Sequence, residues 1–353
     1  MHNNNPAPHE QLSAAVATPP HRLPASPFHP GEQAVQTWAG VRDKAESLGQ
    51  RMLTAELVDA QRAFFAELSF VVAAFVDTQV DDKGRPQAEL VTGPPGFIEV
   101  SDAGNARISR ANNNGPAAPG AALWSAAPGS PLGLLGIDLA RRRRNRINGT
   151  VIESGAGGVK VRIDQGYGNC PKYITRRPWD AVLFAGGYTQ HRSSEVTDEV
   201  AALIGRTDTF FIASSSGPTL VDSQGSGSSF PSAENKPGTF LENIQTSAWG
   251  ADVSHRGGEP GFLNWDGRTL SFDDYPGNNL FNTLGNLQQY PACGLLLMDF
   301  ATGDIVQIAG FAKLSRQDKS DEDPGDDRRG GHFRVSVTVT DVLHWQKEKV
   351  STC

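Results

Sequence analysis

Two short segments in the second half of the chain combine residue types that bind phosphate. Ser254, His255 and Arg256 lie in a run typical of a strand, and Gly257 follows them. Side chains alternate between faces along a strand, so Arg256 shares a face with Ser254 while His255 points the other way. A guanidinium offers a planar fork of donors that suits phosphate oxygens. The segment predicts half of a phosphate site, although a lone arginine on a strand is also common at a solvated surface.

The other half of that site is predicted a few residues later. Gly277, Asn278 and Asn279 precede a segment with helical periodicity, which predicts a helix over 279–289 with Asn282 in its first turn. Asn278 or Asn279 is expected to cap this helix. The free N–H groups and the positive dipole end of a helix start attract anions. Helix capping alone is the alternative role for the two asparagines.

The elements that must position these residues occur twice along the chain. Three blocks recur in the same order in both halves: Gly133–Ala140 with Gly294–Ala301, Pro95–Phe97 with Pro260–Phe262, and Phe70–Ala73 with Phe210–Ala213. Repeats of this length are whole domains, since solenoid units span roughly 20–50 residues. The sequence therefore predicts a disordered tail over 1–30, a first domain over 31–178 that opens with helices, and a second domain over 179–353.

Each predicted domain contains about six short apolar strands separated by turn-rich segments, a pattern typical of small antiparallel barrels. The fold class predicted is therefore mainly β with flanking helices. The net charge of −7 argues against nucleic acid as a partner. The sequence contains no apolar run of the roughly 18–20 residues that a membrane span needs, and no secretory signal is expected.

The three cysteines form no C-x-x-C pair, and the histidines show no metal-binding spacing. This pattern argues against a disulfide framework and against a metal site. The cytoplasm is the expected location.

Three segments resemble the FMN-binding split barrels related to pyridoxamine 5′-phosphate oxidase: Gly250–Phe262, Pro276–Leu287 and Tyr167–Tyr173. The resemblance extends over roughly residues 28 to 345. In that family two six-stranded split barrels pair, and FMN lies in the groove between them. The resemblance implies that this chain supplies both barrels itself, as a tandem pseudo-dimer that could dimerise again.

The resemblance also implies a set of FMN-binding residues. Nine lie in the second barrel and three in the first, which takes the part of the partner barrel: Ser254, His255, Arg256, Gly257, Phe272, Gly277, Asn278, Asn279 and Asn282, with Tyr167, Asn169 and Lys172. Lys172 is expected to stabilise negative charge at the N1/C2 edge of a reduced flavin. A turn at Cys170 and Pro171 with core packing of Tyr173 is the alternative for the first-barrel segment.

The first copy lacks these residues. Aligning the Pro-Gly-Phe blocks places Leu90 and Val91 where His255 and Arg256 stand, and a Pro- and Gly-containing loop replaces the helix. The first barrel is therefore expected to have a degenerate phosphate site, which predicts one FMN per chain. The basic run Arg141–Arg144 is either a solvated hairpin tip or a dock for an anion. That anion would be a nicotinamide dinucleotide phosphate or an acidic redox partner.

The predicted function is that of an FMN-dependent oxidoreductase acting on a small organic substrate, with NADH, NADPH or a partner protein as reductant. The catalytic residues are not identified, because the flavin itself carries the reacting atom. The vitamin B6 oxidase reaction is disfavoured, since the lysine-rich phosphate grip of those enzymes is missing. A non-catalytic flavin-binding or electron-transfer module is the alternative, and a scaffold with two degenerate pockets is a third.

Overall fold

The structure is a computed structural model that describes residues 26–77, 84–101, 104–110, 119–217, 250–317 and 333–348. Most of the predicted tail, the first part of the loop predicted in place of a helix in the first half (residues 111–118), and the end of the chain lie outside these ranges. Phe28 and His29, at the end of the predicted tail, are buried. Ordered structure therefore begins a few residues earlier than the composition indicates.

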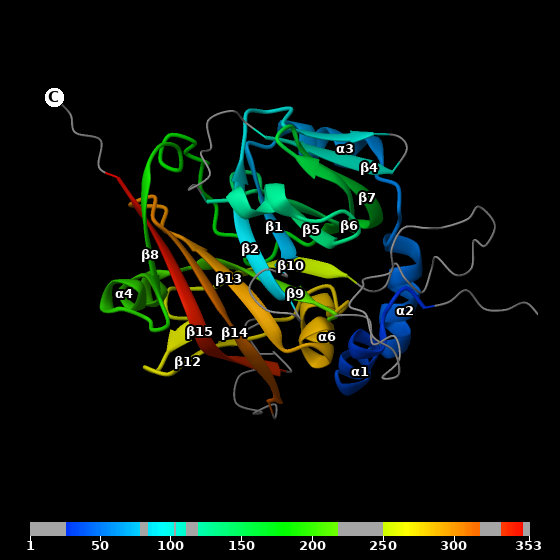
Figure 1. Cartoon of the computed structure of the whole chain (residues 1–353). Helices are drawn as coiled ribbons and strands as arrows, with labels where there is room; N and C mark the ends of the chain where they lie inside the picture. Colours follow the sequence, from blue (N-terminus) through cyan, green and yellow to red (C-terminus); the bar gives the residue numbers. More distant parts are fainter. Residues whose placement is uncertain are drawn as a thin grey trace, which may run out of the picture.

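Two antiparallel sheets form the bulk of the molecule (Figure 1). The first sheet has the strand order β2-β1-β5-β6-β7-β4-β3. Its strands are β1 (Phe70–Asp77), β2 (Arg85–Thr92), β3 (Ile98–Ser101), β4 (Asn105–Ser109), β5 (Pro131–Asp138), β6 (Arg143–Gly155) and β7 (Gly158–Asn169).

The second sheet has the order β10-β9-β13-β14-β15-β12-β11, and β8 pairs with β15 outside that path. Its strands are β8 (Tyr188–Ser193), β9 (Thr209–Ser215), β10 (Ala251–Gly257), β11 (Asn264–Trp265), β12 (Thr269–Asp273), β13 (Ala292–Met298), β14 (Ile305–Arg316) and β15 (Phe333–Lys347). The seven strands of the first sheet thus follow the same order as β9 to β15 of the second. The predicted fold class, mainly β with flanking helices, is confirmed.

The correspondence extends to single residues. The ladder irregularity at Gly149 in β6 recurs at Gly310 in β14, and Gly96 and Gly261 both adopt positive φ, 91° and 90°. Leu135 pairs with Val72 in the first sheet, and its counterpart Leu296 pairs with Phe211 in the second.

This register corrects the predicted alignment of Phe70 with Phe210 by one residue. The pairing partners show that Val71, not Phe70, is the counterpart of Phe210. The difference matters because a slip of one residue exchanges the two faces of a strand. The same register places Leu90 opposite Val72 and His255 opposite Phe211, so Leu90 and His255 lie at matching positions in the two sheets.

The two sheets pack on each other through reciprocal contacts. A Cβ on Gly133 of β5 would lie 3.0 Å from Ala251 of β10, and a Cβ on Gly294 of β13 would lie 2.5 Å from Pro86 of β2. Glycine at both positions lets the backbones of the two sheets approach. A shared apolar cluster fills the space between the sheets, with Val72 and Leu135 from one side and Phe211 and Leu296 from the other.

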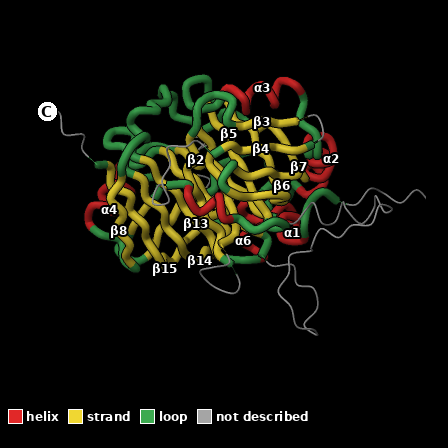
Figure 2. The backbone as a smooth tube through the Cα atoms, turned by 45° about the horizontal axis from the view of Figure 1, so that its top comes forward, coloured by secondary structure: helices red, strands yellow, loops and turns green. Residues whose placement is uncertain are grey.

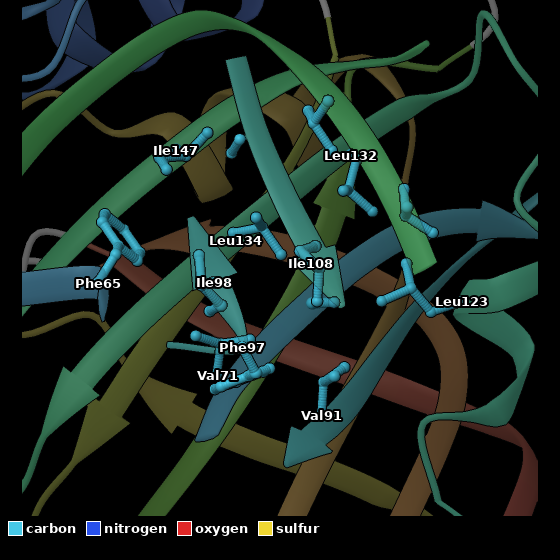
Figure 3. Close-up of a cluster of buried hydrophobic side chains, with 14 of the residues drawn as sticks. Phe65, Val71, Val91, Phe97, Ile98, Ile108, Leu123, Leu132, Leu134 and Ile147 are labelled. Carbon is cyan, nitrogen blue, oxygen red and sulfur yellow. The ribbon is translucent and has the colours of Figure 1, made fainter. Parts of the chain in front are cut away.

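Each sheet also closes over a core of its own. Figure 3 shows the core of the first sheet, a cluster of buried side chains that includes Val71, Val91, Phe97, Leu134 and Ile147. The core of the second sheet includes Phe210, Ile212 and Phe272.

Helices lie at the rim of the strands (Figure 2). They are α1 (Pro30–Trp38), α2 (Arg42–Met52), α3 (Asp59–Glu67), the 3₁₀ turn η1 (Ala121–Ser125), α4 (Asp198–Arg206) and α6 (Asn282–Gln289). No helix within the described ranges is long and apolar enough to cross a membrane.

Helix α6 begins three residues later than predicted. Asn279 and Phe281 both have φ of 61°, a left-handed backbone that cannot continue a helix. Phe281 is the N-cap and makes no side-chain cap, so the predicted capping by Asn278 or Asn279 is wrong. The Asn278 side chain instead accepts a hydrogen bond from the Leu280 N–H at 3.1 Å, which stabilises the turn before the helix.

Candidate anion site between the two sheets

A polar pocket lies where the edge strand β10 meets β6 and the start of α6. The first sheet contributes Arg144, Arg146, Asn169 and Cys170 to its lining; the second contributes Ser254, His255 and Arg256 from β10 and most of the stretch from Asp274 to Leu284. Figure 1 shows β10 lying beneath β5 and β6. Because β10 is at the edge of its sheet, residues from both of its faces reach the pocket.

Arg146 is a buried arginine whose charge is compensated. Its side chain is 6% exposed and forms a 3.0 Å ion pair with the carboxylate of Asp252, which is also buried. The guanidinium donates to the Val253 carbonyl at 3.0 Å, to the Tyr167 hydroxyl at 2.7 Å and to the Ser254 hydroxyl at 2.7 Å. These bonds link both sheets through one side chain and hold it in one orientation.

Arg144 is half-buried and lacks such compensation. Within the described parts of the chain, no carboxylate lies within ion-pair distance of its guanidinium, and its Nε atom has no hydrogen-bond partner. Burial, together with the neighbouring charges of Arg146 and Arg256, lowers the pKa of Arg144 to about 10. The pocket therefore holds a positive charge that lacks a counter-ion.

His255 lies next to that charge. The Arg144 Nη1 atom is 2.9 Å from His255 Nδ1, and an arginine can only donate. His255 Nδ1 therefore accepts, and the neutral ring carries its proton on Nε2, which has no partner. Burial and the charges of Arg144, Arg256 and Arg177 keep the pKa of His255 well below its ordinary value. A neutral histidine with a free N–H is thus a further donor in the pocket.

Arg256, the predicted phosphate ligand, is partly engaged elsewhere. It forms an ion pair with Asp274 and lies over the ring of Phe272, 5.8 Å from its centroid. Its Nε atom has no partner. One edge of the guanidinium therefore stays free, while the other is bound to a carboxylate.

The first turn of α6 completes the polar wall with Asn282, Thr283 and Leu284. The N–H groups at the start of a helix have no acceptor within the helix, and they carry the positive end of its dipole. Thr283 bonds the Ser254 hydroxyl at 2.8 Å and the Asp252 carboxylate at 3.1 Å, which ties the helix start to β10.

A second, more aromatic pocket adjoins the first and shares Arg144, His255 and Arg256 with it. It is lined in addition by Lys172, Tyr173, Gly257, Phe262 and Asp273, and Tyr275 lies in the wall of both pockets. The Tyr173 and Tyr275 rings are 5.2 Å apart. A Cβ on Gly257 would lie 2.0 Å from the Tyr173 carbonyl oxygen, so only glycine permits this approach.

The predicted cofactor-binding residues are brought together across the two sheets. Eight line the polar pocket: Asn169, Ser254, His255, Arg256, Gly277, Asn278, Asn279 and Asn282. Gly257 and Lys172 line the adjoining one. Tyr167 and Phe272 lie behind the lining: Tyr167 is bonded to Arg146 and Asn282, and Phe272 is under Arg256.

The sequence prediction missed Arg144 and Arg146 as pocket residues. The basic run divides at the start of β6: Arg141, Arg142 and Arg143 are exposed, whereas Arg144 and Arg146 share the face that points at β10. Period-two spacing within the run was the available signal, but the predicted strand began at Arg146 and left Arg144 in the hairpin tip.

No protein-family model matches the sequence, and no curated protein sequence matches it. Among solved structures, a variant of HupZ from Group A Streptococcus is similar over 42% of this chain and 98% of its own, with 11% identity and a TM-score of 0.26. A candidate pyridoxamine 5′-phosphate oxidase from Lactobacillus delbrueckii is similar over 42% of this chain and 94% of its own, with 13% identity and a TM-score of 0.26.

Proposed function

We propose that the polar pocket binds the phosphate of FMN, and that the chain is an FMN-dependent oxidoreductase that holds its flavin between the two sheets. The observation that carries the proposal is the uncompensated charge of Arg144, whose Nε atom is buried in the pocket beside the free donors of His255 and Arg256 and beside the start of α6. A buried charge without a partner is costly, and an anionic ligand would relieve that cost.

The balance of charges favours an anion over a neutral ligand. Asp252 and Asp274 compensate Arg146 and Arg256, which leaves Arg144 as the surplus cation. A phosphate would accept from Arg144 Nε, His255 Nε2 and Arg256 Nε, all of which lack partners. Charge-assisted bonds of this kind are among the strongest that a protein forms with a ligand.

The adjoining pocket supports a planar ring system beside the phosphate. Tyr173, Tyr275 and Phe262 give it aromatic walls, and Lys172 adds a cation at its rim. In the proposed complex Lys172 faces the electron-rich edge of the flavin ring, as the resemblance implies. FMN would supply hydride or electron transfer at its ring, while these side chains bind the ring, orient it and exclude water.

We further propose that each chain, built from tandem split barrels over 31–178 and 179–353, has one FMN site. Gln307 takes the place of Arg146 in the second sheet: its Nε2 donates to Ala88 at 2.9 Å, as Arg146 donates to Val253. Three counterparts are apolar and buried, namely Ile305 for Arg144, Trp345 for Asn169 and Leu90 for His255, and the counterpart of Ser254 is the buried acid Glu89. An anion at that second position would face hydrocarbon.

A non-catalytic electron-transfer module is the second proposal, favoured by the exposed arginines beside the pocket. Arg141, Arg142 and Arg143 point to solvent at the tip that precedes Arg144. Such a tip could attract an acidic redox partner. Reduction of bound FMN by NADH or NADPH, followed by reoxidation, would support the enzyme; reduction by a partner protein alone would support the carrier.

The test of the phosphate site compares two neighbouring arginines. Arg144→Ala removes the surplus charge in the pocket, whereas Arg143→Ala, the matched control, removes an exposed one that lies over Phe64. FMN affinity, measured by fluorescence titration, should fall by about 10- to 100-fold in Arg144→Ala and stay unchanged in Arg143→Ala. Equal affinities in the wild type and both variants would refute the assignment.

A further inference from the structure

A buried acid outside both sheets is connected to the pocket. Glu32, on α1, is 3% exposed, and burial raises its pKa well above the ordinary value. One of its carboxylate oxygens accepts from the His29 N–H at 3.0 Å and closes the capping box of α1. The other oxygen accepts from the Asn282 side-chain amide at 2.6 Å. The second bond lies outside the capping box and reaches the first residue of α6.

The connection continues from Asn282 to Arg146 through Tyr167. The Tyr167 hydroxyl donates to Asn282 Oδ1 at 2.9 Å and accepts from Arg146 Nη1 at 2.7 Å. Arginine only donates and a tyrosine hydroxyl has one proton, so each bond fixes the direction of the next. The acceptor on Glu32 therefore determines which way the Asn282 amide faces, and with it the bonding of Tyr167. All four side chains are buried.

The helices α1 and α6, which the hydrogen bond between Glu32 and Asn282 joins, are in close contact. A Cβ on Gly31 would lie 2.2 Å from the Gly285 carbonyl oxygen, and a Cβ on Gly285 would lie 2.4 Å from the Glu32 side chain. Glycine on both helices allows α1 to cross α6 at this distance. Glu32 is thereby held against the start of α6, where the pocket begins.

We propose that Glu32 is a positioning residue, which acts through Asn282 and Tyr167 to hold Arg146 in the orientation that it presents to the pocket. The proposal rests on the proposed function in one respect: it assigns Arg146 to the phosphate end of the ligand. By this proposal the N-terminal helix α1, which lies outside both sheets, takes part in ligand binding.

The test uses FMN and riboflavin, which differ by the phosphate. Glu32→Gln keeps the shape and one acceptor, but it cannot accept both existing bonds. We expect FMN affinity to fall about tenfold and riboflavin affinity to stay at the wild-type value. Glu46→Gln is the matched control, because Glu46 on the neighbouring helix α2 is bonded to Ser26 and Arg42, which are not members of this chain of bonds. Equal loss for both flavins, or none for FMN, would overturn the proposal.

A double-mutant cycle tests the path. Tyr167→Phe removes the hydroxyl that joins Asn282 to Arg146 while keeping the buried ring. If Glu32 acts through Tyr167, the effect of Glu32→Gln on FMN affinity should vanish in the Tyr167→Phe background. Additive effects of the two substitutions would show that Glu32 acts by another route, and would refute the path.

A measurement on the ligand-free protein separates this proposal from the proposed function. Arg146 Nε–H donates to a carbonyl within a buried cluster, so its hydrogen exchange followed by NMR should be slow in the wild type and in Glu46→Gln. We expect faster exchange in Glu32→Gln. Unchanged exchange would overturn the positioning role, even if the wild type binds FMN; failure of the wild type to bind FMN would refute the proposed function alone.

Discussion

Arg144 and Arg146 stand two residues apart on one face of β6, yet their charges are balanced differently. Arg146 is paired with a buried carboxylate, whereas Arg144 faces a neutral histidine and two other arginines. Arg146 is therefore held in place by the structure's own ionic network, while Arg144 keeps more of its bonding capacity for a ligand. This difference predicts that removing the Arg146 side chain destabilises the protein much more than removing the Arg144 side chain.

Replacing each arginine by alanine tests that contrast. Arg146→Ala leaves the Asp252 carboxylate buried without its partner, so the free energy of unfolding should fall by about 3–5 kcal/mol. Arg144→Ala removes a repulsive charge, and the free energy of unfolding should stay within about 0.5 kcal/mol of the wild type or rise. Urea denaturation of the ligand-free proteins measures both. A larger loss for Arg144→Ala than for Arg146→Ala would contradict the charge assignment.

His255 predicts a dependence of stability on pH. Burial first, and the charges of Arg144, Arg256 and Arg177 next, hold its pKa well below the ordinary 6.5. Below pH 6.5 the unfolded chain therefore binds a proton that the folded chain does not, and the contribution of His255 to stability is lost as the pH falls. His255→Gln should show a shallower loss of stability between pH 7 and pH 5, by up to about 1.4 kcal/mol per pH unit. Parallel curves for the two proteins would disprove the neutral state of His255.

The residues of the pocket could be predicted only in part. Ser254, His255 and Arg256 are adjacent in sequence, and their types already indicate phosphate. Arg144 could not be singled out within its basic run, because its place in the pocket depends on a strand more than a hundred residues away in sequence that packs against it from the other sheet. The role of Asp274 could not be predicted for the same reason. Its carboxylate pairs with the Arg256 guanidinium only because the fold brings β10 and β12 together.

At the scale of elements, the crossing of α1 and α6 positions the start of α6. Gly285→Ala would place a methyl group against Glu32, with no space for it. We expect a loss of about 1–3 kcal/mol in the free energy of unfolding. Gly205→Ala on α4 is the matched control, since nothing lies within 4 Å of its added Cβ, and it should stabilise by about 0.5–1 kcal/mol. Equal shifts in the two urea midpoints would contradict the close crossing.

The strands were easier to predict than the helix start. Short apolar runs between turn-rich segments predicted about six strands in each half. The start of α6 depends on two left-handed residues, Asn279 and Phe281, whose conformation cannot be seen in hydrophobic periodicity. The repeated block at Phe210 was misaligned by one residue because both frames match apolar residues. Only the pairing of Phe211 with Leu296 resolves the register.

At the scale of the whole molecule, two sheets of identical strand order pack through reciprocal contacts at Gly133 and Gly294. The arrangement has two related positions between the sheets. Polar residues occupy one position, and buried apolar side chains such as Ile305 and Trp345 occupy the other. The repeated sequence blocks predicted that the two halves share one strand order. The presence of Leu90 at the position that aligns with His255 predicted that only one of the two positions is polar.

The stoichiometry and phosphate dependence of flavin binding test the central claim most directly. Purified protein titrated with FMN, with absorbance and calorimetry as readouts, should bind about one FMN per chain, more tightly than riboflavin. The preference for FMN should be lost in Arg144→Ala. Two FMN per chain would contradict the single site, and a wild type that binds neither flavin would contradict the proposed function.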